Sequence, residues 1–222
     1  MAVASAYPGV CFATAGVHPY SVESCDGETM ARVAALAHSP FVVALGECGL
    51  DTSEGFPPLE LQLKWFEPQV KLACQVGKPL FLHERLAHEA LMAVLEKYQA
   101  DLPPTIVHCF TGNQAELEKY LDMGFFISVS GIICKKDRGA HIRDLLPRIP
   151  LDRLMVETDA PYLGFPGCRV GAPQAPKKSY PNLPAALPLV IKQVAQSVGL
   201  PAEKIAASTA AAARSFFRLA LL

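Results

Sequence analysis

The sequence lacks any run of about 18 apolar residues without a charged one, which is the length that a membrane-spanning helix requires. Its first nine residues also lack the charged segment and the long apolar segment of a signal peptide. We therefore expect a chain without a transmembrane segment, a signal peptide or a membrane partner. The expected location is the cytoplasm, with the nucleus as an alternative.

Cysteine pairs at disulfide or zinc-finger spacing are also missing. The chain has 7 cysteines, an odd number, and no two of them form a Cys-x-x-Cys pair. This distribution argues against a disulfide framework and against a thiolate zinc site. We predict free thiols in a reducing compartment.

The chain has no excess of positive charge. It carries 20 Lys and Arg against 21 Asp and Glu, a net charge of −1, whereas a protein that coats duplex DNA is usually basic. Any contact with nucleic acid must therefore come from a local patch. Because 51% of the 222 residues are apolar, the chain can bury a sizeable core, and we predict a single domain over residues 1–222.

Short apolar runs alternate with amphipathic segments along the chain. The runs are continuous, as is typical of strands covered on both faces. This alternation predicts an α/β fold with a parallel sheet of right-handed strand–helix–strand units. The predicted strands are residues 11–17, 41–46, 79–82, 105–107, 125–130 and 153–158.

Helical spacing marks the segments between these strands. Apolar residues recur from Leu59 to Ala73, although Pro68 is expected to kink that helix or end it early. A later helix is predicted to begin at Asn113 as N-cap, with Glu116 three residues on, and to stop at Gly124. Two more helices are expected over residues 185–198 and 201–219.

A histidine, glutamate or aspartate lies at the end of five of the six predicted strands. In a parallel barrel these strand ends meet at one face, where active sites lie. Histidines and carboxylates that converge there would be costly to bury without positive charge, which a divalent metal supplies. Nitrogen and oxygen ligands suit zinc, manganese or magnesium. The five residues are His18, Glu47, His83, His108 and Asp159.

A single histidine after an apolar run is more often structural than a metal ligand, so the hypothesis depends on the repetition at equivalent strand ends. Cys48 and Cys109 adjoin the candidate ligands, and side-chain alternation should point their thiols away from the metal. We interpret His38, His88 and His141 as surface residues. Residues 83–88 look like a zinc-protease HExxH motif, but they contain one residue too many.

Four segments of the sequence, in order, resemble the signature segments of the TatD family of metal-dependent deoxyribonucleases. The resemblance extends from about Tyr7 to the C-terminus and does not depend on one short pattern. The segments are residues 15–19 (AGVHP), 44–51 (ALGECGLD), 107–112 (VHCFTG) and 156–162 (VETDAPY).

The resemblance implies a TIM-barrel-like (β/α)8 metallohydrolase fold and metal-dependent DNase activity. It implies metal ligands at Glu47, His83, His108 and Asp159, with Glu47 as the central ligand and His18 in the catalytic pocket. Asp159 would orient or deprotonate the attacking water. We expect one or two divalent ions, with Mg²⁺ as the activating ion and Zn²⁺ or Mn²⁺ as alternatives.

The sequence departs from the family pattern in three places. Two strand–helix units that precede His18 in the family are missing, so the resemblance implies about six units and two exposed sheet edges that favour instability or self-association. Arg85 follows Glu84 where a Cys-Arg pair is expected. The last loop keeps Asn182 and Pro184 but lacks the acidic residue between them.

The reaction that the resemblance implies is hydrolysis of phosphodiester bonds in DNA by a 3′-5′ exonuclease, at single strands or 3′ ends, without an obligate protein partner. Glu157 is either a partner of the metal site or a structural residue of the sheet. For base stacking we expect Phe110 and Tyr162. The expected phosphate-binding residues are His18, Arg85, Lys135, Lys136 and Lys177, with Arg138 and Lys178 in the same loops.

Two other functions use the same sequence features. The metal site would also suit amide or ester hydrolysis, as in a D-aminoacyl-tRNA deacylase, because a fold does not determine the substrate. The chain would otherwise be an inactive truncated isoform. An assay on single-stranded DNA beside an aminoacyl ester separates these hypotheses.

Overall fold

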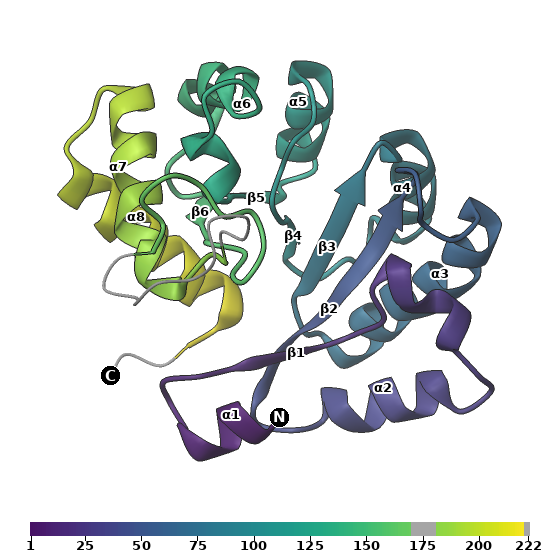
Figure 1. The fold of residues 1–222 in the computed structure, drawn as a ribbon. Coiled ribbons are helices and arrows are strands. Elements are labelled where there is room, and N and C mark those ends of the chain that lie inside the picture. Colours follow the sequence, from purple (N-terminus) through teal and green to yellow (C-terminus); the bar gives the residue numbers. More distant parts are fainter. Residues whose placement is uncertain (170–180, 220–222) are drawn as a thin grey trace. The chain divides into compact units, whose positions relative to one another are not determined.

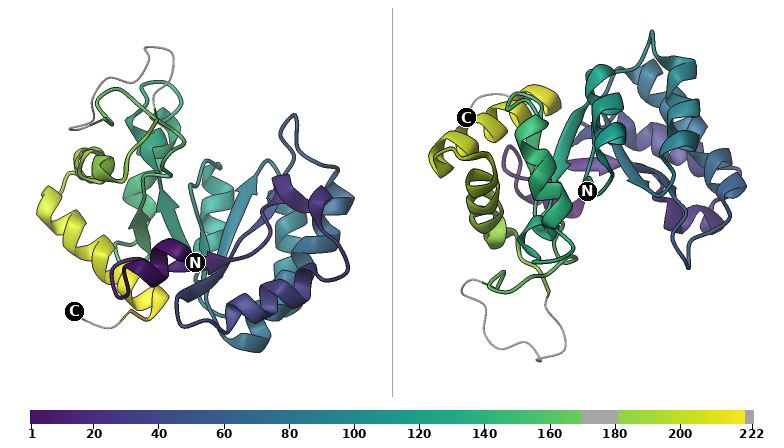
Figure 2. Two further views of the ribbon diagram at one scale, coloured as in Figure 1. Left: turned by 60° about the horizontal axis from the view of Figure 1, so that its bottom comes forward. Right: turned by 90° about the horizontal axis from the view of Figure 1, so that it is seen from above.

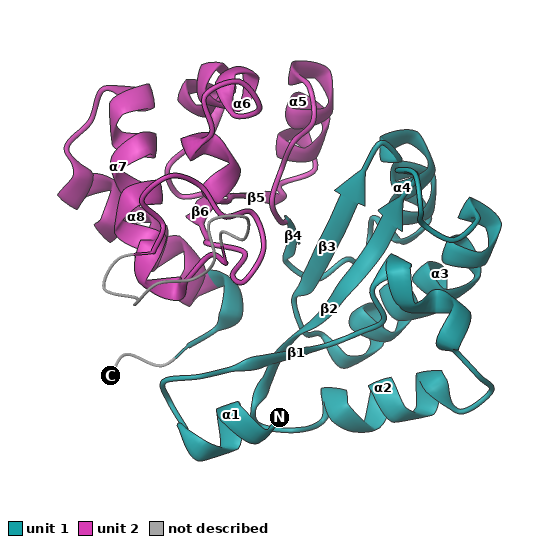
Figure 3. Ribbon diagram, in the orientation of Figure 1, with its two compact units in different colours: residues 1–107, 216–222 teal, residues 108–215 magenta. Residues whose placement is uncertain are grey.

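The computed structural model describes residues 1–169 and 181–219. Strands and helices alternate along the chain (Figure 1). They divide into two compact units, one of Met1–Val107 with Phe216–Leu222 and one of His108–Ser215 (Figure 3). The prediction of one domain over residues 1–222 stays a prediction.

Unit 1 holds four strands in parallel, and each pairs with the next one along the chain. Helices α2, α3 and α4 pack against the central strand β2, so the strand–helix–strand interpretation is correct for this unit (Figure 1). The elements are α1 (Ala2–Ala6), β1 (Ala13–Ala15), the 3-10 helix η1 (Pro19–Ser24), α2 (Thr29–Ala37), β2 (Val42–Asp51), α3 (Leu59–Val76), β3 (Leu80–Arg85), α4 (His88–Leu95), η2 (Glu96–Tyr98) and β4 (Thr105–Val107).

Unit 2 continues the same alternation. Its strands β5 and β6 are parallel, with Ile127 opposite Leu154, and helix α7 packs against β6 and α6 (Figure 2). Val190 and Val194 of α7 are fully buried. The elements are α5 (Gln114–Asp122), β5 (Phe126–Val129), η3 (Gly131–Cys134), α6 (Ala140–Leu145), η4 (Leu146–Arg148), β6 (Leu154–Val156), η5 (Pro184–Ala186), α7 (Leu187–Val198) and α8 (Ala202–Phe217).

All six predicted strands form, but two of them run further than predicted. Strand β2 continues to Asp51 and strand β3 to Arg85. Sequence reading ended both strands where polar residues interrupt the apolar run, whereas the backbone ladder does not depend on side-chain polarity. Glu47 and His83 therefore lie within strands and do not follow them.

Pro68 does not end helix α3, so that part of the prediction is wrong. The helix continues to Val76 and buries Phe66, Val70 and Ala73 along one face. This packing outweighs the backbone hydrogen bond that proline cannot donate. The predicted capping box is confirmed, because the Asn113 side chain accepts from the Glu116 amide and the Glu116 side chain accepts from the Asn113 amide.

A bulge in β2 places Glu47 beside β3. Leu45 pairs with Leu80 but Cys48 pairs with Leu82, so β2 has one extra residue between these points. Gly46 and Gly49 have φ of 136° and 145°, and a Cβ at either would collide with a backbone carbonyl oxygen of β3. Only glycine lets the two strands approach so closely.

Two expectations about the chain as a whole can be compared with the structure. All seven cysteines are free, as predicted. Within residues 1–169 and 181–219, none of the helices is both long and apolar enough to cross a membrane.

We predict that Gly49→Ala destabilises the chain by about 2 kcal/mol or more, because its Cβ would displace the β3 backbone. Gly27→Ala is the matched control, since nothing lies within 4 Å of a Cβ at that position. Urea unfolding followed by circular dichroism measures both. Equal midpoints for the two variants would show that the close approach of β2 and β3 is not required.

Candidate metal centre

Three predicted side chains gather in unit 1. One ligand atom from each of His18, Glu47 and His83 lies within 4.8 Å of the other two. Glu47 Oε1 is 2.8 Å from His83 Nδ1 and 3.4 Å from His18 Nε2. The three side chains are partly exposed to solvent, at 31% for His18, 32% for Glu47 and 18% for His83.

A second carboxylate, which the sequence analysis missed as a site residue, contacts His83 from the other side. Asp51 Oδ2 lies 2.9 Å from His83 Nε2, and Asp51 is only 1% exposed. The signal was present in the segment at residues 44–51, because alternate residues of a strand share a face and Asp51 is four residues after Glu47.

Asp51 is held in its ionised form. Burial raises the pKa of its carboxyl group, but hydrogen bonds from His83 and Ser53 lower it more, and the net pKa lies below the ordinary value. An ionised carboxylate only accepts hydrogen bonds, so His83 Nε2 must be the nitrogen that donates. In a neutral His83 ring, Nδ1 then carries the lone pair.

The His83 Nδ1 lone pair points at Glu47 Oε1. Two lone pairs 2.8 Å apart repel each other unless a proton or a cation lies with them, and His18 Nε2, 3.4 Å from each of the two atoms, offers only a long contact. A divalent metal meets this requirement, and carboxylate oxygen with imidazole nitrogen is a usual ligand set for one. The residues therefore fit a metal that binds through Glu47 and His83.

His18 is bonded differently. Its Nδ1 accepts a hydrogen bond of 3.1 Å from the Tyr20 amide, at the start of η1. In a neutral imidazole the proton is then on Nε2, which faces Glu47. His18 is thus arranged as a hydrogen-bond donor and not as a ligand through Nε2, although it lies in the same cluster.

Two glutamines of α3 position the strand ends, and sequence reasoning did not identify them. The Gln69 side chain accepts from the Val17 amide at 2.6 Å and donates to the Val17 carbonyl at 3.3 Å. Gln62 bonds the amide and the carbonyl of Asp51 in the same way, at 2.8 and 2.7 Å. Both side chains lie on the buried face of α3, where a polar residue needs such partners.

In unit 2, His108 forms a second pair with a carboxylate. His108 Nδ1 lies 3.1 Å from Glu157 Oε1, and the His108 side chain is buried. Glu157 is therefore a partner of a predicted ligand, and it contacts His108 directly. A carboxylate on Nδ1 leaves Nε2 as the nitrogen with a lone pair.

Asp159 also lies in unit 2, three residues beyond the end of β6. Its φ is 58°, in the left-handed region, and its carbonyl accepts from the Tyr162 amide at 2.8 Å. Buried Asn182 donates a short hydrogen bond to the Thr158 carbonyl beside it. The prediction that His108 and Asp159 share a metal with Glu47 and His83 stays a prediction.

Among the predicted phosphate-binding residues, Arg85 is exposed at the end of β3. Lys135 and Lys136 lie in the loop after η3, where Arg143 donates to the carbonyls of both residues and of Ile133. Sequence reasoning missed Arg143, which fixes this basic loop. Arg138 is exposed further along the same segment. Lys177 and Lys178 lie outside the described residues.

Cys48 is fully buried, and burial, followed by the charge of Glu47, raises the pKa of its thiol far above the usual range, as a packing residue requires. Phe110 is 1% exposed, so the prediction that it stacks on bases is wrong. His88 is half-buried, whereas His38 and His141 are exposed as expected.

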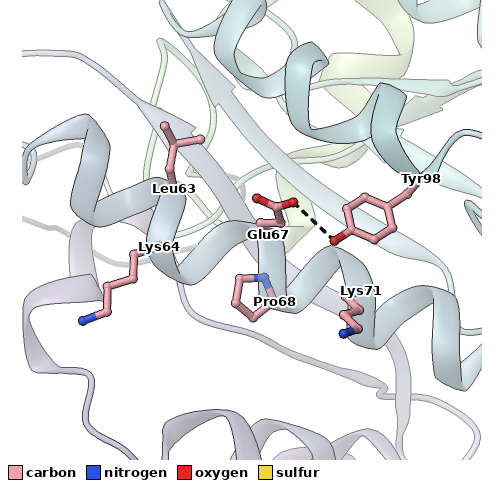
Figure 4. A pocket seen from close by; sticks show the side chains of 6 residues that line it. All are labelled: Leu63, Lys64, Glu67, Pro68, Lys71 and Tyr98. Carbon is pink, nitrogen blue, oxygen red and sulfur yellow. Dashed lines mark hydrogen bonds between the residues drawn. The ribbon is translucent and has the colours of Figure 1, made fainter.

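Two hollows in the described part of the chain lie away from these residues. One, of about 380 Å³, follows the outer side of α3 (Figure 4). Its carboxylate Glu67 already accepts hydrogen bonds from Lys97 and Tyr98. The other, of about 560 Å³, lies in unit 2 between Phe126, Arg153 and α8. Neither hollow is lined by any of the five predicted metal-site residues.

Comparison with known protein families matches residues 1–218 to the family described as TatD related DNase. The chain belongs to the TatD family. It is therefore a metal-dependent hydrolase of the DNase type, and the contact of Glu47 with His83, with His18 beside them, fits that metal dependence. The resemblance that the strand-end segments indicated is confirmed.

Two curated relatives of this TatD chain are each 43% identical to it and are named 3′-5′ ssDNA/RNA exonuclease TatD. The match with the protein from Erwinia tasmaniensis covers 99% of this chain and 83% of the relative. The match with the protein from Edwardsiella piscicida covers 98% of this chain and 82% of the relative.

Solved structures agree on the fold. The TatD homologue YJJV from Escherichia coli K12 is 28% identical, with a TM-score of 0.86 over 98% of this chain and 81% of that one. A TatD family hydrolase from Entamoeba histolytica, at 20% identity and a TM-score of 0.82, supports the fold alone. The predicted TIM-barrel-like α/β fold of the TatD family is confirmed.

We predict that Asp51→Asn weakens metal binding about 10- to 100-fold, because the amide carries no charge and does not fix the His83 tautomer. Competition with a fluorescent chelator measures the affinity directly. Asp26→Asn is the matched control, since that carboxylate of unit 1 bonds Arg32 and not the cluster. Metal affinity equal to that of the control would rule out the role of Asp51.

Proposed function

We propose that this TatD chain is a metal-dependent exonuclease that removes nucleotides from the 3′ ends of single-stranded DNA or RNA. The observation that carries the proposal is the Glu47 carboxylate oxygen facing His83 Nδ1, 2.8 Å away, in a chain of this family. The curated relatives support the polarity and the single-stranded substrate, because they are named for both.

In this proposal Glu47 Oε1 and His83 Nδ1 bind the metal, with His108 and Asp159 as the further ligands that the strand-end segments predict. We propose Mg²⁺ as the activating ion, one or two per chain, with Mn²⁺ and Zn²⁺ as alternatives that suit the imidazole ligands. A bound ion of this kind polarises a phosphoryl oxygen and lowers the pKa of water. Asp159 takes the proton of the attacking water.

His18 has a separate role in the proposal. Its Nε2 hydrogen, whose position follows from the Tyr20 amide on Nδ1, donates to a phosphate oxygen of the substrate. Arg85, Lys135 and Lys136 bind the nucleic acid backbone. Because the net charge of the chain is −1, affinity comes from these few cations and falls moderately with salt.

The seven free thiols support a reducing compartment such as the cytoplasm as the place of this activity. They are spread over both units, and two of them, Cys48 and Cys168, are fully buried.

We predict that Glu47→Gln lowers exonuclease activity by more than about 100-fold, because the loss of a partner outside the ligands already costs 10- to 100-fold in metal sites. The assay follows 3′- and 5′-labelled single-stranded oligonucleotides, and chelation of the wild type should abolish cleavage until Mg²⁺ is restored. Glu67→Gln, which removes an exposed carboxylate bonded to Lys97, is the control.

The same assay can contradict the proposal. Turnover that survives both chelation and Glu47→Gln would exclude the metal mechanism. Release of label from the 5′ end first would reverse the polarity. Cleavage of an aminoacyl ester but not of the oligonucleotide would favour the deacylase alternative.

A further inference from the structure

Two aromatic side chains of unit 1 lie beside the candidate metal ligands. The Phe56 ring stacks on the His83 ring with centroids 6.2 Å apart and planes 24° apart. Tyr20 meets Phe56 edge to face at 5.6 Å, and Phe56 also lies 6.1 Å from the His18 ring. The aromatic pair of Tyr20 and Phe56 is thus continuous with both histidines of the cluster.

Tyr20 is exposed in spite of this contact. It is 63% exposed, whereas Phe56 is half-buried in the loop between β2 and α3. The Tyr20 backbone is held in place, because the Tyr20 amide donates a hydrogen bond to His18 Nδ1. An exposed tyrosine is ordinary on a surface, but this one is tied to a residue of the site and rests on a ring that stacks on a metal ligand.

The geometry suits a nucleobase. In an extended single strand, base and phosphate alternate, and aromatic side chains beside a phosphate site hold bases by stacking, whatever their sequence. A base in a duplex is already stacked and paired, so it reaches such a ring only after being extruded. The aromatic pair therefore provides a physical reason for choosing single strands.

We propose that Tyr20 and Phe56 form a stacking platform for the base next to the cleaved phosphate, and that this platform gives the enzyme its preference for single strands. The inference rests on the proposed function, because it assumes that a phosphodiester is bound at Glu47 and His83. Phe56 is the inner ring, packed on His83, and Tyr20 is the outer, exposed ring on which the base stacks.

The test is a binding measurement in chelator, where no cleavage occurs. Fluorescence anisotropy compares a single-stranded oligonucleotide with one whose last two nucleotides lack bases. The wild type should bind the base-bearing strand about tenfold more tightly, since one aromatic stack is worth ~1–3 kcal/mol. Tyr20→Ala should remove most of that preference and Tyr20→Phe should keep it. Tyr7→Ala, a tyrosine of similar exposure at 60%, is the control.

Kinetics with Mg²⁺ complete the experiment. Loss of a stacking contact that is present in both the ground state and the transition state raises KM and leaves kcat nearly unchanged. Tyr20→Ala should therefore raise KM for single strands with little change in kcat. Phe56→Leu, which keeps the loop apolar, should show a smaller loss of the same kind.

The outcomes separate the two proposals. A wild type that binds the strands but cleaves neither defeats the proposed function. A wild type that cleaves single strands but binds both oligonucleotides equally, or whose preference survives Tyr20→Ala, overturns the platform. A fall in kcat with the base preference intact would also overturn it, because Tyr20 would then act only by positioning His18.

Discussion

The arrangement of unit 1 depends on one close contact, between a carboxylate oxygen of Glu47 and the imidazole Nδ1 of His83 at 2.8 Å, which is favourable only with a proton or a cation between the two atoms. A buried carboxylate behind the His83 ring holds that ring in place. Asp51 accepts from the far nitrogen of His83, so a neutral ring cannot present its one proton to Glu47 without losing a buried hydrogen bond. Gly46 and Gly49 allow β2 and β3 to lie close enough for this contact. The site is therefore organised to receive a cation before one is bound.

Unit 2 also has a histidine with a carboxylate on one ring nitrogen, but there the carboxylate contacts Nδ1 and not Nε2. His83 is held through Nε2 by Asp51 and keeps its Nδ1 lone pair, whereas His108 is held through Nδ1 by Glu157 and keeps Nε2. A carboxylate behind each imidazole fixes its tautomer and makes the remaining nitrogen more basic. The two pairs differ in burial, since Asp51 is 1% exposed and the Glu157 side chain 19%.

Much of this could be predicted from the sequence, because parallel strands leave continuous apolar runs and active-site residues lie near their ends. Six strands, the capping box and the clustering of Glu47 with His83 followed from those patterns. Asp51 was missed although it shares a strand face with Glu47, because the shared face does not show that its carboxylate reaches His83. The two glutamines of α3 were missed because spacing does not separate a polar residue that bonds a neighbouring backbone from one that faces solvent. The prediction that Phe110 stacks on bases was wrong because its position close to His108 in the sequence does not show that its side chain is buried.

The missed glutamines have a consequence for how the site tolerates evolutionary change. Gln62 and Gln69 are seven residues apart on α3, about 10.5 Å along the helix axis and close to two full turns. Gln62 bonds the end of β2 and Gln69 bonds the segment after β1. The spacing of the two glutamines along α3 must therefore match the distance between these two backbone segments. An insertion or deletion of one residue between them would rotate one amide by about 100° and release one strand end. The number of residues between Gln62 and Gln69 is thus fixed, whereas the outward-facing side chains of the same helix are free to vary.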